Sequence, residues 1–159
     1  MDVGRDKCGN QCGSTCQIVS MYAVVDTNVF VSAFITRHSD SATKRIVDCI
    51  ISGEIIPVYS DEILCEYKDV LSRPKFRLEQ EDIDSLLMLL VEKGVSSARF
   101  CYAGEMIDPK DRVFYEISLS IEGSFLVTGN LKHFPVTPLV VSPAKMLEIL
   151  EASRRKSAH

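Results

Sequence analysis

Two kinds of hydrophobic pattern alternate along this chain. Short apolar runs bounded by polar, Gly or Pro residues are typical of buried strands, and apolar residues at i, i+3, i+4 and i+7 indicate amphipathic helices. The runs predict strands at residues 22–26, 55–59, within 95–102, 125–130 and 139–141. The helical spacing predicts helices at residues 27–35, 41–52, 60–72, 79–93, 108–122 and 142–151. This alternation predicts a three-layer α/β/α fold with a parallel sheet of about four to five strands.

The predicted domain covers residues 21–151. Residues 1–20 show no hydrophobic period, and Met21 comes directly before the first strand, so we expect a disordered leader or an added or upstream segment. Residues 152–159 are expected to be a frayed tail.

The six cysteines form two groups. Three stand among apolar residues and are expected to be reduced core side chains: Cys49, Cys65 and Cys101. The other three lie in the polar N-terminal segment: Cys8, Cys12 and Cys16. A zinc site is the alternative for this second group, but no fourth ligand is evident, so we favour a segment without structure.

Composition narrows the possible functions. The 159 residues fit one domain, and 46% hydrophobic with 25% charged residues is ordinary for a soluble globular protein. A net charge of −4 argues against a protein that coats nucleic acid, but not against an enzyme that acts on it through a local patch. No apolar run approaches the roughly 18 residues that span a bilayer, and no secretory signal is visible, so we expect a cytoplasmic protein without a membrane partner.

Polar side chains occur at four places where a predicted element begins, ends or turns its edge to solvent. They are Asp26-Thr27-Asn28, Glu66, Asp108-Pro109-Lys110-Asp111 and Thr128-Gly129-Asn130. Open α/β sheets place ligands at the carboxyl ends of their strands. Carboxylates gathered there repel one another unless a cation lies between them, and such oxygen ligands suit Mg²⁺ or Mn²⁺. The pattern therefore predicts a metal site that orients water toward a phosphodiester.

Each place also has a simpler interpretation when taken alone. Asp26 fits a helix N-cap, and Asp108-Pro109-Lys110-Asp111 is a typical helix start. Glu66 fits a solvated helix acid, and Thr128-Gly129-Asn130 fits a turn. The catalytic interpretation depends on their occurring together, in this order, at the ends of the right elements.

Four motifs carry a family resemblance. They are Val24 to Ala33, Ser60 to Glu66 with Leu71 to Lys75 after it, Asp108 to Phe114, and Leu126 to Asn130. Over about residues 22–150 the chain resembles a PIN domain, of the group that includes toxins of bacterial toxin–antitoxin systems. The resemblance implies a small α/β protein with a parallel sheet and a ribonuclease activity that depends on Mg²⁺ or Mn²⁺. It also implies an RNA substrate, an antitoxin protein that blocks the site, and a homodimer.

The resemblance assigns roles to single residues. The catalytic acids that hold the metal correspond to Asp26, Glu66 and Asp111. Asn28 and Thr128 match the polar residues that support these acids, and Asp108 matches the start of its motif.

Two positions depart from the family pattern. Asn130, where relatives often have Asp, is a candidate metal ligand without charge, and Arg112 stands where many relatives have a further acid. Lys110, Arg112, Lys132 and His133 are candidate contacts for RNA phosphates, although scattered basic residues are usually only solvated. His133 is also a candidate general base.

Two other functions compete with the nuclease. A phosphatase of the haloacid dehalogenase type needs a second Asp where this chain has Asn28, and an acidic pair where residues 129–147 contain no acid. A non-catalytic PIN-like module that binds RNA or protein is motivated by Asn130 and Arg112. The amphipathic helix pair around residues 60–93 is the expected partner or dimer surface.

Overall fold

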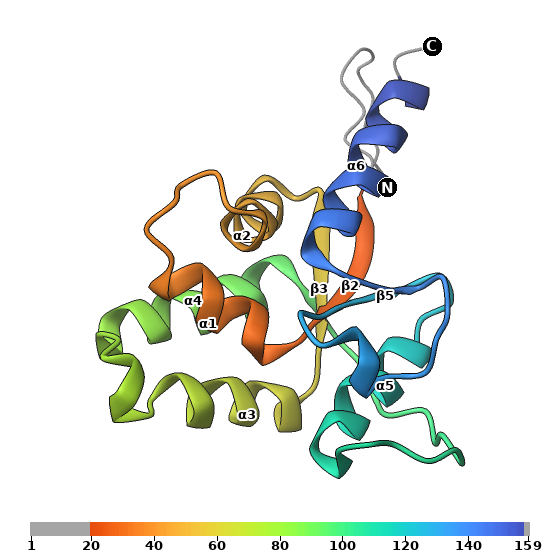
Figure 1. Cartoon of the computed structure of the whole chain (residues 1–159), viewed down its shortest axis with the longest axis horizontal. Coiled ribbons are helices and arrows are strands. Elements are labelled where there is room, and N and C mark those ends of the chain that lie inside the picture. Colours follow the sequence, from red (N-terminus) through yellow and green to blue (C-terminus); the bar gives the residue numbers. More distant parts are fainter. Residues whose placement is uncertain (1–19, 158–159) are drawn as a thin grey trace, which may run out of the picture.

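The computed structural model describes residues 20–157, and their five strands form one parallel sheet (Figure 1). The strands are β2 (Met21–Val25), β3 (Ile55–Tyr59), β4 (Val95–Ser96), β5 (Phe125–Val127) and β6 (Val140–Val141). Their order across the sheet is β4-β3-β2-β5-β6. The expected leader at residues 1–20 lies outside the described part except for Ser20, and Cys8, Cys12 and Cys16 lie there too.

Helices connect successive strands. They are α1 (Thr27–Ile35), α2 (Ala42–Ser52), α3 (Asp61–Leu71), α4 (Gln80–Lys93), α5 (Arg112–Leu119) and α6 (Pro143–Ser157), with short 3₁₀ turns η1 (Pro74–Phe76), η2 (Pro109–Asp111) and η3 (Leu131–His133). The connections from β2 to β3 and from β3 to β4 progress toward one edge, whereas the connection through α5 returns across the sheet. Because such crossovers are right-handed, α5 covers the face opposite α1 to α4. The predicted three-layer α/β/α fold is confirmed.

The central strand β2 is buried because it has neighbours on both sides and helices on both faces. Ala23, Val24 and Val25 are each at most 1% exposed. Beside them, the ring of Tyr67 from α3 meets Phe30 of α1 edge-on at a centroid distance of 5.1 Å. These contacts fix α1 and α3 against the strand that leads to Asp26.

The order of the strands makes the position between β2 and β5 the switch point of the sheet, where open α/β sheets have their crevice. The chain leaves β2 toward β3 on one side, while β5 arrives on the other side, so the connections diverge between these two strands. Ligands of open α/β sheets bind at such a switch point, outside the carboxyl ends of the strands. Asp26 follows β2 and Thr128 follows β5, and both therefore stand at this crevice.

The predicted helix at 108–122 was too long. The chain first makes the 3₁₀ turn η2, and α5 then begins at Arg112 and ends at Leu119. The first break arises because the Asp108 carboxylate accepts a hydrogen bond from the Lys110 amide at 3.0 Å, which fixes a tight turn. At the other end, the Ser120 hydroxyl and amide both donate to the Ile117 carbonyl, so the helix closes early.

Residues 152–157, most of the segment expected to be a frayed tail, belong to the last helix. Helix α6 continues to Ser157. The Arg154 guanidinium donates to the Glu54 carboxylate, and Arg155 pairs with Glu151 at 3.2 Å. The first pair holds the end of the helix near the start of β3, and the second lies within the helix.

The expected burial of three cysteines is confirmed only for Cys49. Cys65 and Cys101 are exposed, and all three are free thiols. Cys65 lies on the solvent side of α3, and Cys101 lies in the loop before η2. Apolar neighbours in the sequence therefore did not predict the burial of these two cysteines. Among the described residues, no helix is both long and apolar enough to cross a membrane.

We predict that Tyr67→Phe lowers the free energy of unfolding by about 1–2 kcal/mol, because the buried hydroxyl donates to the Val25 carbonyl. Urea denaturation measures this change. Tyr22→Phe is the matched control, since Tyr22 is 40% exposed. An equal loss in both variants would show that the Tyr67–Val25 bond contributes nothing particular to stability.

Candidate functional site

The carboxylate of Asp26 is held between the ends of two neighbouring strands. It is 6% exposed, and its Oδ2 accepts a hydrogen bond from Thr128 Oγ1 at 2.8 Å and one from Asn28 Nδ2 at 3.3 Å. Asn28 Oδ1 in turn accepts from the Gly129 amide at 3.1 Å, and Thr128 Oγ1 accepts from the Asn130 amide at 3.0 Å. The two polar motifs thus form one network.

This network bears on whether Asp26 is a helix N-cap or a residue of the candidate site. The residue occupies the N-cap position of α1, yet its side chain makes no capping hydrogen bond. The carboxylate is instead oriented by Thr128 and Asn28. Asp108 behaves in the opposite way, because it caps its own turn through the Lys110 amide.

The position of Asp26 makes its ionisation costly. Burial raises the pKa of Asp26 from 3.8 to about 6, the hydrogen bond from Thr128 opposes this rise, and the negative charge of Asp111 adds to it. Asp111 is therefore close enough for its charge to act on Asp26. Burial, followed by the charge of Asp108, also raises the pKa of Asp111.

Asp111 has a basic partner. His133 Nδ1 lies 3.2 Å from Asp111 Oδ2, and the Asp111 side chain is only 15% exposed. This contact joins η2 to η3, which begins just after the Thr128 turn. Asp26, Asp111 and His133 consequently belong to one half-buried group at the crevice.

Glu66 stands apart from this group. It is half-buried on α3, next to Tyr67, whose hydroxyl reaches the Val25 carbonyl just before Asp26. Within residues 20–157, no hydrogen bond or ion pair joins Glu66 to either Asp. In the same range, no group of three or more His, Cys, Asp or Glu residues is arranged to hold a metal ion.

The residues present nevertheless fit a divalent cation. Mg²⁺ is usually bound by one or two carboxylates together with water and substrate phosphates, and not by a cage made only of protein. Asp26 is buried and Asp111 is half-buried, and the two carboxylates repel each other, which a cation between them would reverse. The hydroxyl of Thr27, beside Asp26, is also buried without a hydrogen-bond partner among the described residues.

Comparison with known families shows the family of the chain. A family model described as PIN domain matches residues 22–132. The chain belongs to the PIN domain family. PIN domains are generally nucleases and typically use divalent metals. The match favours a nuclease over a haloacid dehalogenase-type phosphatase. A comparison with individual curated proteins finds no match.

The match covers nearly all of the predicted site of this PIN domain. It includes Asp26, Glu66, Asp111 and Asn130, and it ends one residue before His133. Asn130 is exposed, and its backbone amide, which donates to Thr128, ties it to the network.

Two of the four expected phosphate contacts are open to solvent. Lys110 and Lys132 are exposed beside Asp111 and His133. Arg112 differs, because its guanidinium donates to the carbonyls of Tyr102 and Gly104. His133 is half-buried against Asp111.

Sequence reasoning missed Glu116. This side chain is 5% exposed on α5 and accepts hydrogen bonds from Arg99 Nε at 2.7 Å and the Tyr102 amide at 2.9 Å. The available signal was its position one helical turn after Arg112, among the apolar residues of the buried helix face.

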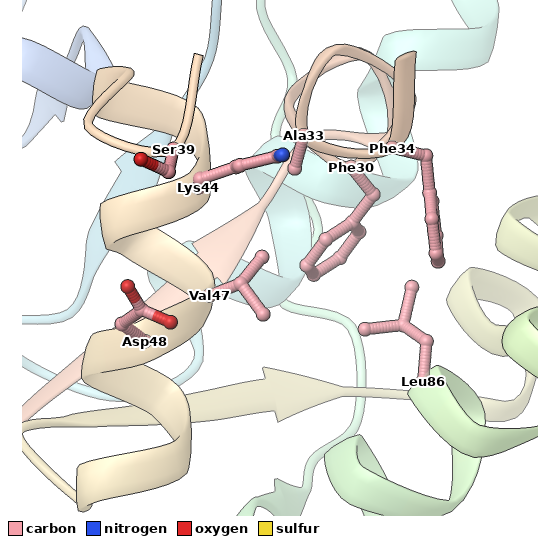
Figure 2. A pocket seen from close by; sticks show the side chains of 8 residues that line it. All are labelled: Phe30, Ala33, Phe34, Ser39, Lys44, Val47, Asp48 and Leu86. Atoms are coloured by element: carbon pink, nitrogen blue, oxygen red, sulfur yellow. The ribbon is translucent and has the colours of Figure 1, made fainter. Parts of the chain in front are cut away.

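A separate cavity of about 360 Å³ lies between α1, α2 and α4 (Figure 2). Phe30, Val47 and Leu86 point into it from three helices, and Lys44 reaches across its rim toward Ala33. None of the residues that line it belongs to the group around Asp26. The PIN domain therefore has an apolar cavity on one side of α1 and the acidic site at the start of that helix.

We predict that Asp26→Asn stabilises the metal-free protein at neutral pH but not at pH 4. The folded-state pKa is raised, so the folded form binds the proton more tightly than the unfolded form. The resulting cost is absent below pH 3.8, grows toward pH 6, and is complete above it. A shift of this size corresponds to at most about 3 kcal/mol.

Urea denaturation with a chelator, at several pH values from 4 to 7, measures the difference between Asp26→Asn and wild type. Asp69→Asn is the control, because the Asp69 side chain is 73% exposed. A variant that is less stable than wild type at pH 7 would contradict the predicted cost of ionising Asp26.

Proposed function

We propose that this PIN domain is a metal-dependent endoribonuclease that hydrolyses RNA phosphodiester bonds with Mg²⁺ or Mn²⁺. The observation that carries the proposal is the pair Asp26 and Asp111, two repelling and largely buried carboxylates at the switch point of the sheet. Such an arrangement costs stability, and groups with perturbed pKa values in a crevice are typical of functional sites.

The residues of the site have distinct tasks in this proposal. Asp26 and Asp111 would hold the cation, and Glu66 and Asn130 are its further candidate ligands. A bound divalent cation supplies positive charge opposite the phosphodiester and lowers the pKa of water. Thr128 and Asn28 both donate to Oδ2 of Asp26 and so fix the plane of its carboxylate.

Basic groups on the Asp111 side complete the proposed site. His133 can hold a proton next to Asp111 Oδ2, 3.2 Å away. Lys110 and Lys132 are exposed on the same two turns, where they can meet the phosphates that flank the scissile bond. Because these cations are local, the net charge of −4 is compatible with RNA binding.

We further propose that the protein is the toxin of a toxin–antitoxin pair and forms a homodimer. Helix α4 leaves apolar side chains uncovered, with Met88 69% and Val91 50% exposed. The same helix contributes Leu86 to the apolar cavity of Figure 2, which has room for apolar side chains of an antitoxin. Both features support a protein partner on this side of the molecule.

The second candidate is a non-catalytic PIN module that binds RNA or protein. The observations that favour it are the neutral Asn130 and the separation of Glu66 from the two Asp side chains in the described structure. Metal binding distinguishes the candidates, because the second one needs no cation.

We predict that Mn²⁺ raises the melting temperature of the wild-type protein. A ligand that binds only the folded form adds about 2.7 kcal/mol at a free concentration of 100 Kd. Differential scanning fluorimetry with millimolar Mn²⁺ measures the shift, with Asp26→Asn as the variant expected to lose it. An unchanged wild-type melting temperature would favour the non-catalytic module.

We predict that Asp26→Asn and Asp111→Asn each lower RNA cleavage by about 100-fold or more. Charge stabilisation by a cation is worth several kcal/mol, and each 1.36 kcal/mol is a factor of ten in rate. A fluorescently labelled single-stranded RNA with Mn²⁺ measures the rate, and a DNA of the same sequence tests for the sugar.

Arg73→Ala is the matched control, because Arg73 pairs with the exposed Asp69 at 3.5 Å on α3. Glu66→Gln asks whether this acid joins the site when metal and RNA are bound. Equal cleavage by wild type and both Asp variants would identify a contaminating nuclease and refute the proposal.

A further inference from the structure

The guanidinium of Arg112 binds the backbone of a neighbouring loop. Arg112 Nη1 donates to the Tyr102 carbonyl at 2.6 Å, and Nη2 donates to the Gly104 carbonyl at 2.8 Å. The guanidinium carbon also lies 5.9 Å from the centre of the Tyr102 ring. Two parallel donors on one planar group fix both the loop and the arginine.

Glu116 fixes the same loop from the next turn of α5. Its carboxylate accepts from Arg99 Nε and from the Tyr102 amide, and it lies 3.7 Å from Arg112 Nη1. The bond from Tyr102, followed by that from Arg99, lowers the pKa of Glu116, so the group is ionised at neutral pH. The Glu116 carbonyl also accepts from the Phe100 amide at 3.2 Å.

The packing around Tyr102 fits the loop closely to α5. The Tyr102 ring packs edge-on against Tyr115 of α5 at a centroid distance of 4.8 Å. A Cβ atom at Gly104 would lie 2.2 Å from the Tyr102 hydroxyl oxygen, so a side chain there would displace the ring. The loop from Arg99 to Gly104 thus fits closely over the beginning of α5.

Asp111 is the residue directly before Arg112. Its turn is closed by its own bonds, from the Asp111 amide to the Asp108 carbonyl at 3.0 Å and from the Lys110 amide to the Asp108 side chain. Within residues 20–157, these bonds tie the turn to itself, whereas Arg112 ties it to the loop and to Glu116. Arg112 therefore anchors the backbone next to Asp111, while the Asp111 carboxylate itself meets His133 Nδ1 at 3.2 Å.

We propose that Arg112 and Glu116 are positioning residues that hold the Asp111 carboxylate toward Asp26. The proposal rests on the proposed nuclease function, because it assigns Asp111 a place in the metal site. It also replaces the expected phosphate contact of Arg112, whose donors are already bound to Tyr102, Gly104 and Glu116. An additional acid at this position would add to the repulsion between Asp26 and Asp111, whereas Arg112 adds no negative charge.

The first experiment compares Arg112→Ala, Asp111→Ala and the double variant. We measure the Kd for Mn²⁺ by calorimetry and kcat and KM on the labelled RNA. Loss of a group that orients a metal ligand typically weakens binding by 10- to 100-fold, so we expect about a tenfold higher Kd for Arg112→Ala. We expect a lower kcat, an unchanged KM, and no further loss when Arg112→Ala is added to Asp111→Ala.

Other outcomes overturn the proposal. A raised KM with unchanged kcat and a shallower salt dependence would make Arg112 a phosphate contact. Additive losses in the double variant would show that Arg112 does not act through Asp111. Glu116→Gln should reproduce the pattern of Arg112→Ala more weakly, and Arg73→Ala should change nothing.

A second measurement does not depend on nuclease activity. Hydrogen exchange of the Lys110 and Asp111 amides should become at least about tenfold faster in Arg112→Ala than in wild type or Arg73→Ala. Arg112→Lys, which keeps the charge but cannot donate to both carbonyls in the same geometry, carries the test if Arg112→Ala does not fold. If the wild type neither binds Mn²⁺ nor cleaves RNA, the proposed function fails. Unchanged exchange would then refute the positioning role separately.

Discussion

The buried carboxylate of Asp26 is the constraint on which the rest of this site depends. An ionised group in this position loses hydration, and the hydrogen bonds from Thr128 across the ends of β2 and β5 and from Asn28 on α1 partly offset this loss. Thr128 reaches Asp26 because both strands end at the same level of the parallel sheet. The strand register, in which Val25 pairs with Val127, therefore also brings Asp26 and Thr128 together.

Contacts from the helices also position the residues around Asp26. Tyr67 joins α3 to the last carbonyl of β2, and Phe30 packs α1 against the same ring. Burial raises the pKa of Asp26, and repulsion from the charge of Asp111, on the turn before α5, raises it further. The hydrophobic core between the strands and the helix faces stabilises the fold in spite of this repulsion. The unfavourable free energy is confined to a few groups at the edge of the sheet.

Sequence patterns predicted the framework well, because it follows from simple periodicity. The apolar run before Asp26 and the one before Thr128 predicted two buried strands that end in polar residues, but only the structure shows that these strands are neighbours in the sheet. Patterns failed where an outcome depends on distant packing. Cys65 and Cys101 have apolar neighbours in sequence but face solvent, and α5 ends early because of hydroxyl groups on Ser118 and Ser120. The contacts of Glu116 with the loop at Arg99 and Tyr102 span 17 and 14 residues, beyond the reach of any local pattern.

Arg112 departs from the family pattern, and its role can be inferred only from its contacts in the structure. In the sequence it replaces an acid and therefore suggests a weakened metal site or a contact with RNA. In the structure its charge is turned away from both tasks, toward two carbonyls and the buried Glu116. Because Glu116 is already paired with Arg99 and Arg112, the acids with raised pKa values at the crevice are Asp26 and Asp111. If these two acids hold the cation, their placement matters, and we propose that the contacts of Arg112 with Tyr102, Gly104 and Glu116 contribute to it.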